Sequence, residues 1–181
     1  MPCSGTFILT LHNYISMYKR TRAIDCIQKE TMKQIPPITT CWEDTSVYIP
    51  PVDSGRVIKV YDGDSLTIAV YMNNEIDKPY RFAVRLHGVD CPEKRSHNQT
   101  ERTVSAIAQC HIEKMTLGSI INLKNVSFDK YGRLLASVIT SDNIDLSSWL
   151  LDKRLAVPYG GGCRKGGPNC WLAYYNTGSL E

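Results

Sequence analysis

The sequence lacks the cysteine patterns that mark a zinc site or a disulfide framework. Its 181 residues include seven cysteines, but no Cys-x-x-Cys pair occurs and no cysteine–histidine cluster has zinc-ligand spacing. An odd number of cysteines without a framework is typical of reduced thiols, so we expect a reducing, cytoplasm-like compartment. A disulfide between Cys163 and Cys170 is the alternative for an exported protein.

Long hydrophobic runs are also missing. The longest apolar stretch near the start is Phe7-Ile8-Leu9, which Thr10 interrupts and no basic segment precedes. A membrane-spanning helix needs about 20 apolar residues, and a signal peptide needs a longer apolar region. We therefore expect no signal peptide, no transmembrane segment and no membrane partner.

A large charge of one sign is absent as well. The net charge is +3 at pH 7, and the content of 43% hydrophobic and 22% charged residues is ordinary for a soluble globular protein. So small a net charge gives little attraction for a polyanion. The acid count includes Asp64, Asp90 and Glu93, however, and a bound dication would offset their charge. The working surface would then be more basic than the formal sum.

From residue 55 the hydrophobic pattern predicts a small barrel. β-Branched and other apolar residues alternate between turn residues and predict five strands, at 55–61, 65–72, 79–86, 120–128 and 134–140. Apolar residues at helical spacing predict a helix that Gly118 ends, and Asp145 is placed to cap a second helix. Five strands with a helix between the third and fourth is the order of the OB-fold. We therefore predict an α+β domain, a five-stranded Greek-key barrel with two or three helices.

The two ends of the chain carry no comparable pattern. Residues 14–32 are apolar enough for a weak helix, and Pro50-Pro51 marks a boundary. We predict an extension at residues 1–50, partly ordered and without an assigned function, before a domain at 51–181. Near the C-terminus, glycines exclude a helix until about Asn169.

Three short polar motifs lie at the ends of predicted strands. Asp-Gly-Asp-Ser stands at 62–65, Arg-Leu-His-Gly-Val-Asp-Cys-Pro-Glu at 85–93, and Asp-Lys-Tyr-Gly-Arg at 129–133. Carboxylates from two loops can hold a hard cation, and arginines from two loops can bind a phosphate. This combination is the chemistry of a metal-dependent phosphodiesterase.

In this order and spacing, the three motifs resemble the active-site signature of the staphylococcal nuclease (thermonuclease-like) family, over roughly residues 55–160. The resemblance implies the same OB-fold and a calcium-dependent endonuclease that hydrolyses phosphodiester bonds of DNA, RNA or both. It also implies that a metal-bound water attacks phosphorus and leaves 3′-phosphate and 5′-hydroxyl ends. The implied partner is the nucleic acid substrate, and we expect a monomer.

The resemblance assigns the metal ligands residue by residue. Asp64 and Asp90 would bind Ca²⁺ together with the backbone carbonyl of Cys91. Most members of the family have threonine at that position. Because the main chain supplies the ligand, cysteine is expected to be tolerated there, whereas its soft thiol would be a poor calcium ligand.

The resemblance also assigns the residues that meet the substrate. Arg85 and Arg133 would bind the phosphate and stabilise the charge that builds on it. Glu93 would act as general base or orient the attacking water. Tyr131 and Tyr159 would contact the nucleotide, and a stacking tyrosine suits an enzyme without sequence specificity.

Each of these residues also has an ordinary structural explanation. Asp64 could cap amides of its turn, Arg85 could pair with a neighbouring acid, and Glu93 could be a surface glutamate. For Asp62 we expect only a role in shaping the loop. The rival hypothesis for the domain is a noncatalytic OB-fold module that binds nucleic acid or protein. Such modules typically lose active-site residues, whereas this chain keeps the whole set: Asp64, Arg85, Asp90, Glu93 and Arg133.

Overall fold

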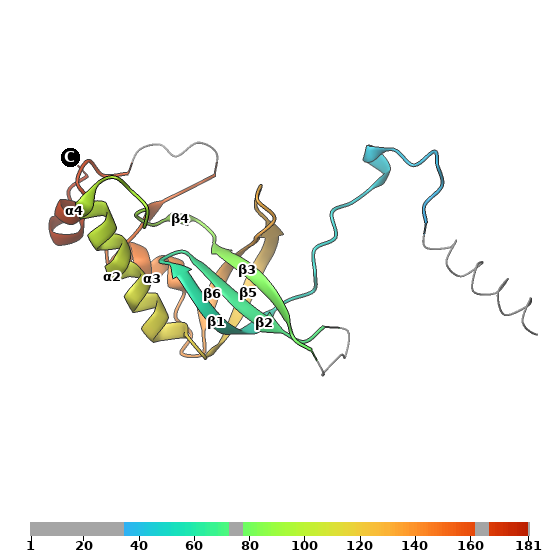
Figure 1. The fold of residues 1–181 in the computed structure, drawn as a ribbon, viewed down its shortest axis with the longest axis horizontal. Helices are drawn as coiled ribbons and strands as arrows, with labels where there is room; N and C mark the ends of the chain where they lie inside the picture. The colour runs from blue at the N-terminus through green and yellow to red at the C-terminus, as the bar shows by residue number, and fades with distance from the viewer. Residues whose placement is uncertain (1–34, 73–77, 162–166, 181) are drawn as a thin grey trace, which may run out of the picture. The chain divides into compact units, whose positions relative to one another are not determined.

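The chain divides into two units, Met1–Tyr48 and Ile49–Glu181. The computed structural model describes residues 35–72, 78–161 and 167–180 (Figure 1). The helix expected at 14–32 lies outside the described residues. In the first unit, residues 35–48 contain one turn of 3₁₀ helix, η1 (Trp42–Asp44).

The second unit is built around a closed five-stranded barrel (Figure 1). In barrel order the strands are β1 (Ser54–Asp62), β2 (Ser65–Val70), β3 (Tyr80–Leu86), β6 (Leu134–Thr140) and β5 (Ile120–Phe128). Neighbouring strands are antiparallel except β3 and β6, which run parallel. Together with three helices, this barrel confirms the predicted OB-fold-like α+β domain.

Three helices accompany the barrel: α2 (Gln99–Thr116), α3 (Leu146–Asp152) and α4 (Trp171–Thr177). Asp145 caps α3 by accepting from the amide of Ser148, as the sequence predicted. The side chain of Asn98, which was not predicted as a cap, caps α2 by accepting from the amide of Thr100. Helix α2 packs against β1 and α4. Among the described residues, none of the helices has the length and apolar content needed to cross a bilayer.

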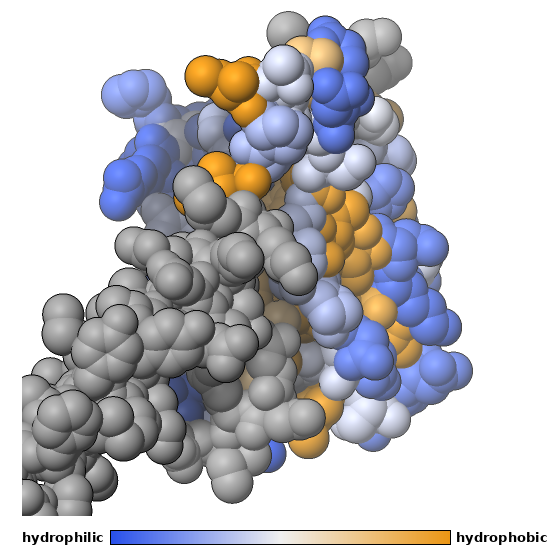
Figure 2. All heavy atoms as spheres, turned by 90° about the vertical axis from the view of Figure 1, so that its right-hand side faces the viewer, coloured by the Kyte–Doolittle hydropathy of each residue, from blue (hydrophilic) through white to orange (hydrophobic). Residues whose placement is uncertain are grey.

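The core fills the inside of the barrel and the space beneath the helices. Most of its largest fully buried side chains come from the five barrel strands or from α2, α3 and the segment after α3, and they include Val57, Ile68, Leu86, Ile112, Ile121, Leu134, Leu150 and Leu155. The outer surface differs from this core. On the side that Figure 2 shows, hydrophobic residues form separate patches among hydrophilic ones. The burial of apolar area inside the barrel therefore stabilises the strands that carry the polar motifs.

Strand β1 departs from simple alternation at two places. Val57 pairs with Ile68 and Lys59 with Thr67, so Ile58 is an extra residue, and a second extra residue precedes Asp62. Such β-bulges bend a strand and increase its twist, as barrel closure requires. They also place the buried residues of β1 three positions apart. The strict alternation predicted for this strand is wrong at these two positions.

A second, two-stranded sheet lies beside the barrel. Strand β4 (Val89–Asp90) pairs with β7 (Val157–Pro158), and the amide of Tyr159 donates to the carbonyl of Gly88 at 2.9 Å. The sequence did not predict either strand. Their pairing fixes the segment after α3 against the loop that carries the second motif.

Candidate functional site

Asp64 is the most enclosed carboxylate of the site. It lies in the turn between β1 and β2 and is 2% exposed. Its Oδ1 accepts from the Ser65 hydroxyl at 3.0 Å and forms an ion pair with Arg85, and its Oδ2 accepts from the amide of Cys91 at 2.8 Å. Burying a carboxylate is costly unless it is paired and hydrogen-bonded, and here both oxygens are satisfied.

Arg85 holds the first two motifs together. It lies near the end of β3, directly opposite Ser65 in the register of β2 and β3. Besides pairing with Asp64, its Nη2 donates to Oδ1 of Asp90 at 2.9 Å and to the carbonyl of Val89 at 3.0 Å. A single guanidinium therefore brings Asp64 and Asp90 together although they are 26 positions apart.

Ser65 connects these residues to the third motif. Its hydroxyl oxygen accepts from Nη1 of Arg133 at 3.2 Å, while the hydroxyl donates to Asp64. Ser65 is buried on the same row of the barrel wall as Arg85. The parallel pairing of β3 with β6 brings the start of β6, and with it Arg133, beside this row.

Asp129 holds Arg133 in place. Its Oδ1 accepts from the amides of Tyr131 at 2.8 Å and of Arg133 at 2.9 Å, and its Oδ2 accepts from Nε of Arg133 at 2.6 Å. Burial alone would raise the pKa of Asp129, but the hydrogen bonds from Arg133 and Tyr131 and the charge of Arg133 outweigh it, so the pKa lies below its ordinary value. Gly132 has φ +79°, a backbone angle that glycine adopts without strain, and this closes the turn.

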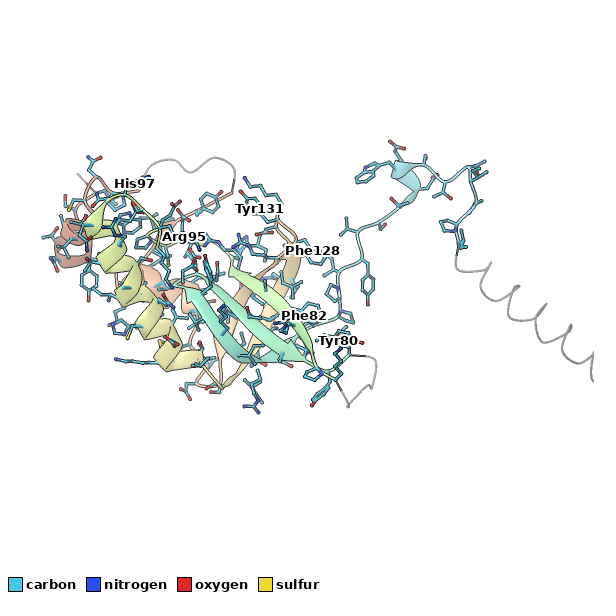
Figure 3. The ribbon with its side chains drawn as sticks, viewed as in Figure 1. Tyr80, Phe82, Arg95, His97, Phe128 and Tyr131 are labelled. Carbon is cyan, nitrogen blue, oxygen red and sulfur yellow. The ribbon has the colours of Figure 1, made fainter. Side chains whose placement is uncertain are left out.

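Tyr131 stands at the tip of that turn and is 73% exposed (Figure 3). Nζ of Lys130 lies 5.0 Å from the centre of its ring and Cζ of Arg133 lies 5.6 Å away. An exposed ring close to two cations can stack on a base beside a phosphate. In Figure 3, Tyr80 and Phe82 lie toward the other end of β3, away from this tip.

Asp62 shares the turn with Asp64 but has a different environment. It pairs across β1 and β2 with Ser65, and its Oδ1 accepts from the amide of Asp64 at 3.4 Å. Burial raises the pKa of Asp62, and hydrogen bonds from Ser65 together with the nearby charge of Arg85 offset this only in part. The contact with the Asp64 amide agrees with the expected role in shaping the loop.

Glu93 lies on an exposed loop between β4 and α2. Its amide donates to Oε1 of Glu101 in the first turn of α2 at 2.9 Å. The same loop is held farther on, where Nη1 of Arg102 donates to the carbonyl of Ser96 at 2.7 Å. Helix α2 therefore fixes the backbone position of Glu93, and the side chain of Glu93 remains exposed at the surface.

Cys91 is buried at the centre of the site, where its amide binds Asp64. A Cβ built on Gly63 would lie 2.8 Å from its Sγ and 2.8 Å from Cβ of Ala108. The turn between the two aspartates thus packs tightly on the loop that follows β4. In the described part of the chain, Cys41, Cys91, Cys110 and Cys170 are free thiols, and Cys163 lies outside it.

Tyr159 follows β7 and is half-buried. Through the pairing of β4 with β7 and its own amide bond to Gly88, its backbone is fixed beside the loop that leads to Asp90. The structure thus brings the candidate residues Asp64, Arg85, Asp90, Cys91 and Arg133 into one connected group. Glu93, Tyr131 and Tyr159 are carried by segments attached to that group.

Sequence reasoning missed three residues that hold this group together. They are Ser65, which bridges Asp64 and Arg133; Asp129, which holds Arg133; and Glu101, which holds the loop of Glu93. Two of them lie inside the motifs, so the motif itself was the available signal. For Glu101, the first turn of a helix that follows a charged loop was the only hint.

The donor set can be tested for its fit to a metal ion. In the ranges that the structure describes, no group of three or more His, Cys, Asp or Glu side chains forms a metal site. Two carboxylates, Asp64 and Asp90, do converge on the same guanidinium. A hard dication is often held by one or two carboxylates with backbone carbonyls and waters, so these residues fit such an ion.

Comparisons with known proteins agree with this geometry. Residues 83–165 match the model of a family described as "Staphylococcal nuclease homologue". Two proteins named "Uncharacterized endonuclease", from Escherichia coli O157:H7 and Escherichia coli, are each 24% identical to this chain over 105 residues. The aligned region covers 58% of this chain and 60% of each relative. The resemblance seen in the motifs is thereby confirmed.

Proposed function

We propose that this chain is a calcium-dependent nuclease of the staphylococcal nuclease family, which hydrolyses phosphodiester bonds of DNA, RNA or both; the match of residues 83–165 to the model of that family supports this. The observation that carries this proposal is the continuous polar network that joins all three motifs. Its members, in order of contact, are Asp90, Arg85, Asp64, Ser65, Arg133 and Asp129.

The network supports a phosphate site with two guanidinium groups. Arg85 and Arg133 each contact the pair formed by Asp64 and Ser65, so both cations lie at one end of the barrel. Planar guanidinium donors match phosphate oxygens in pairs and stabilise the charge that increases as the reaction proceeds. Because their contacts hold both guanidinium groups in place, the site needs little reorganisation when a phosphate binds.

The carboxylates support a cation beside that phosphate. Asp64 and Asp90, with the backbone carbonyl of Cys91, would hold Ca²⁺, which would supply positive charge against the phosphate and neutralise the carboxylates. In the structure, Arg85 pairs with Oδ1 of each of these carboxylates. With Ca²⁺ bound to the two carboxylates, the N–H donors of Arg85 would be available to the substrate.

Glu93 is the residue proposed to move the proton. In the reaction, a water oxygen forms a bond to phosphorus, the bond from phosphorus to the 5′-oxygen breaks, and the water proton passes to Glu93. The departing 5′-oxygen takes a proton from solvent. The products are a 3′-phosphate end and a 5′-hydroxyl end.

The ends of the products give the direct test of this chemistry. Single-stranded DNA and RNA would be incubated with the protein and Ca²⁺, and the fragments would be treated with a phosphatase specific for 3′ ends. We expect fragments whose mobility changes on that treatment, in reactions that a chelator stops. Fragments with 5′-phosphate ends would contradict the proposed direction of cleavage.

A further inference from the structure

The outer face of β1, β2 and β3 carries an ordered set of residues that the proposed reaction does not use. The pairing register arranges these residues in rows that cross the three strands. From the site outward, the rows are Asp62–Ser65–Arg85, Lys59–Thr67–Ala83 and Arg56–Ala69–Arg81. The first row belongs to the site, and the other two extend along the barrel wall away from it.

The two outer rows lie on the same face as the site. Side chains alternate along a strand, so Arg81 and Ala83 share a face of β3 with Arg85. Val84 and Leu86 point the other way and are buried. The site and the outer rows are therefore parts of one continuous surface, on the wall of the barrel nearest the viewer in Figure 1.

The outer rows carry positive charge and no negative charge. Arg56, Lys59 and Arg81 are exposed, and neither these rows nor the rest of β2 and β3 contain an acidic residue. In the part of the chain that the structure describes, none of the three cations forms an ion pair. Nη1 of Arg56 donates to the carbonyl of Gly118, which holds that guanidinium at the edge of the face.

Small side chains form the floor between these cations, namely Thr67, Ala69 and Ala83. Arg56 and Arg81 are two strand spacings apart, about 10 Å, so one extended chain fits between them. Along β3, Arg81 lies about 13 Å from Arg85, since a strand rises about 3.3 Å per residue. At about 3.4 Å per stacked nucleotide, this length corresponds to about four nucleotides.

We infer that this face, the basic track (Arg56, Lys59 and Arg81 with the small residues between them), binds the phosphate backbone of a single-stranded nucleic acid whose scissile bond lies at the site. The inference rests on the proposed function for the identity of the ligand. A polyanion is the complement of a face with several exposed cations, and the small side chains between them let its backbone approach closely.

The track predicts how cleavage depends on the length of the substrate. The first variant is Lys59→Gln with Arg81→Gln, because both side chains are exposed and neither forms a hydrogen bond or ion pair with the described residues. The matched control is Lys114→Gln with Lys153→Gln, which removes the same charge from exposed positions on α2 and after α3. Each protein would be assayed on a dinucleotide and on a strand of about ten nucleotides.

The expected effect follows from counterion release. With a slope of about 0.7 per phosphate contact on a single strand, each cation contributes roughly fivefold at 0.1 M salt relative to 1 M. In the first variant, kcat/KM for the long strand should fall about 25-fold at 0.1 M salt and recover toward the wild-type value at 1 M. The dinucleotide should be cleaved as by wild type, and the control variant should match wild type on both substrates.

A second pair of variants tests the small residues that lie between the cations. Ala83→Glu places a negative charge in the middle of the track, and Ala83→Gln places a neutral side chain of the same size there. We expect the glutamate to weaken cleavage of the long strand much more than the glutamine does, and more so at low salt. Equal effects of the two would overturn the inference, as would wild-type kcat/KM on the long strand in the double variant.

Failure of the proposed function would be seen separately. If the wild type cleaves neither substrate, binding of a labelled single strand is measured instead, in the presence of a chelator. Weaker binding by Lys59→Gln with Arg81→Gln than by the control would support the track without the reaction. Equal binding by the two would overturn it.

Discussion

Nη1 of Arg133 donates a hydrogen bond to the hydroxyl oxygen of Ser65 at 3.2 Å, across 68 positions of the sequence. The same hydroxyl donates to Asp64, which is paired with Arg85. The two arginines of the site are therefore linked through one serine. Because that serine is buried and its pairing in β2 is fixed, the barrel itself determines how the guanidinium groups are placed.

Ser65→Ala should uncouple the two arginines. The change removes two hydrogen bonds, and we expect a loss of about 1–3 kcal/mol of stability together with a fall in kcat of ten- to a hundredfold. Ser65→Thr keeps the hydroxyl and should restore most of the activity. Steady-state kinetics with urea unfolding of all three proteins tests this, and wild-type kcat in Ser65→Ala would contradict the linkage.

Much of the fold could be predicted from the sequence because its signals are local. Strands β5 and β6 begin and end at the predicted residues, and Asp145 caps α3 as expected. The bulges of β1 could not be predicted, since they depend on how Val57 and Val60 meet β2 inside a closed barrel. Strands of two residues, such as β4 and β7, carry too little pattern to recognise.

For the candidate site, the motifs predicted which segments meet but not what holds them. The charged residues were visible because three motifs stand in order. The bridge through Ser65 and the contact of Glu101 with the amide of Glu93 are tertiary contacts between segments that the sequence does not align. Such contacts follow only from the register of the barrel and the docking of α2.

Glu101→Ala should misplace the proposed base without unfolding the protein. Oε1 of Glu101 accepts from the amide of Glu93, so its loss frees the loop. We expect kcat to fall by about tenfold to a hundredfold with little change in KM, because misplacement affects the reacting groups more than binding. Glu101→Gln retains an acceptor and should be close to wild type. A larger effect on KM than on kcat would contradict a positioning role.

Gly63→Ala should destabilise the turn that carries both aspartates. The new Cβ would lie 2.8 Å from Sγ of Cys91 and 2.8 Å from Cβ of Ala108, so the backbone must move. Overpacking of this kind costs about 1–3 kcal/mol. Gly160→Ala is the matched control, because a Cβ there would meet nothing within 4 Å. Thermal unfolding of the two variants tests this prediction. Equal unfolding midpoints would contradict it, because they would show that the turn accommodates the new Cβ without loss of stability.

Asp129→Asn should lower stability in a pH-dependent way. The pKa of Asp129 is lowered in the folded protein, so its charge stabilises the fold above the unfolded-state pKa of about 3.9, and this contribution is lost as the pH falls through the folded-state pKa. The urea midpoints of wild type and variant should therefore differ near pH 7 and converge in acid below about pH 4. Asp142→Asn, at an exposed turn, is the control. A difference between the two urea midpoints that grows in acid would contradict a lowered pKa of Asp129 in the folded protein.

The most direct test is cleavage of single-stranded DNA and of RNA by the wild type and by Glu93→Gln, each with Ca²⁺ and with a chelator. Circular dichroism would first show that the variant is folded, and binding of the uncleaved strand would show that its substrate site is intact. We predict calcium-dependent cleavage by the wild type that falls by about a hundredfold or more in Glu93→Gln, with binding retained. Binding without cleavage by the wild type in Ca²⁺, or equal turnover by both proteins, would contradict the proposed enzyme.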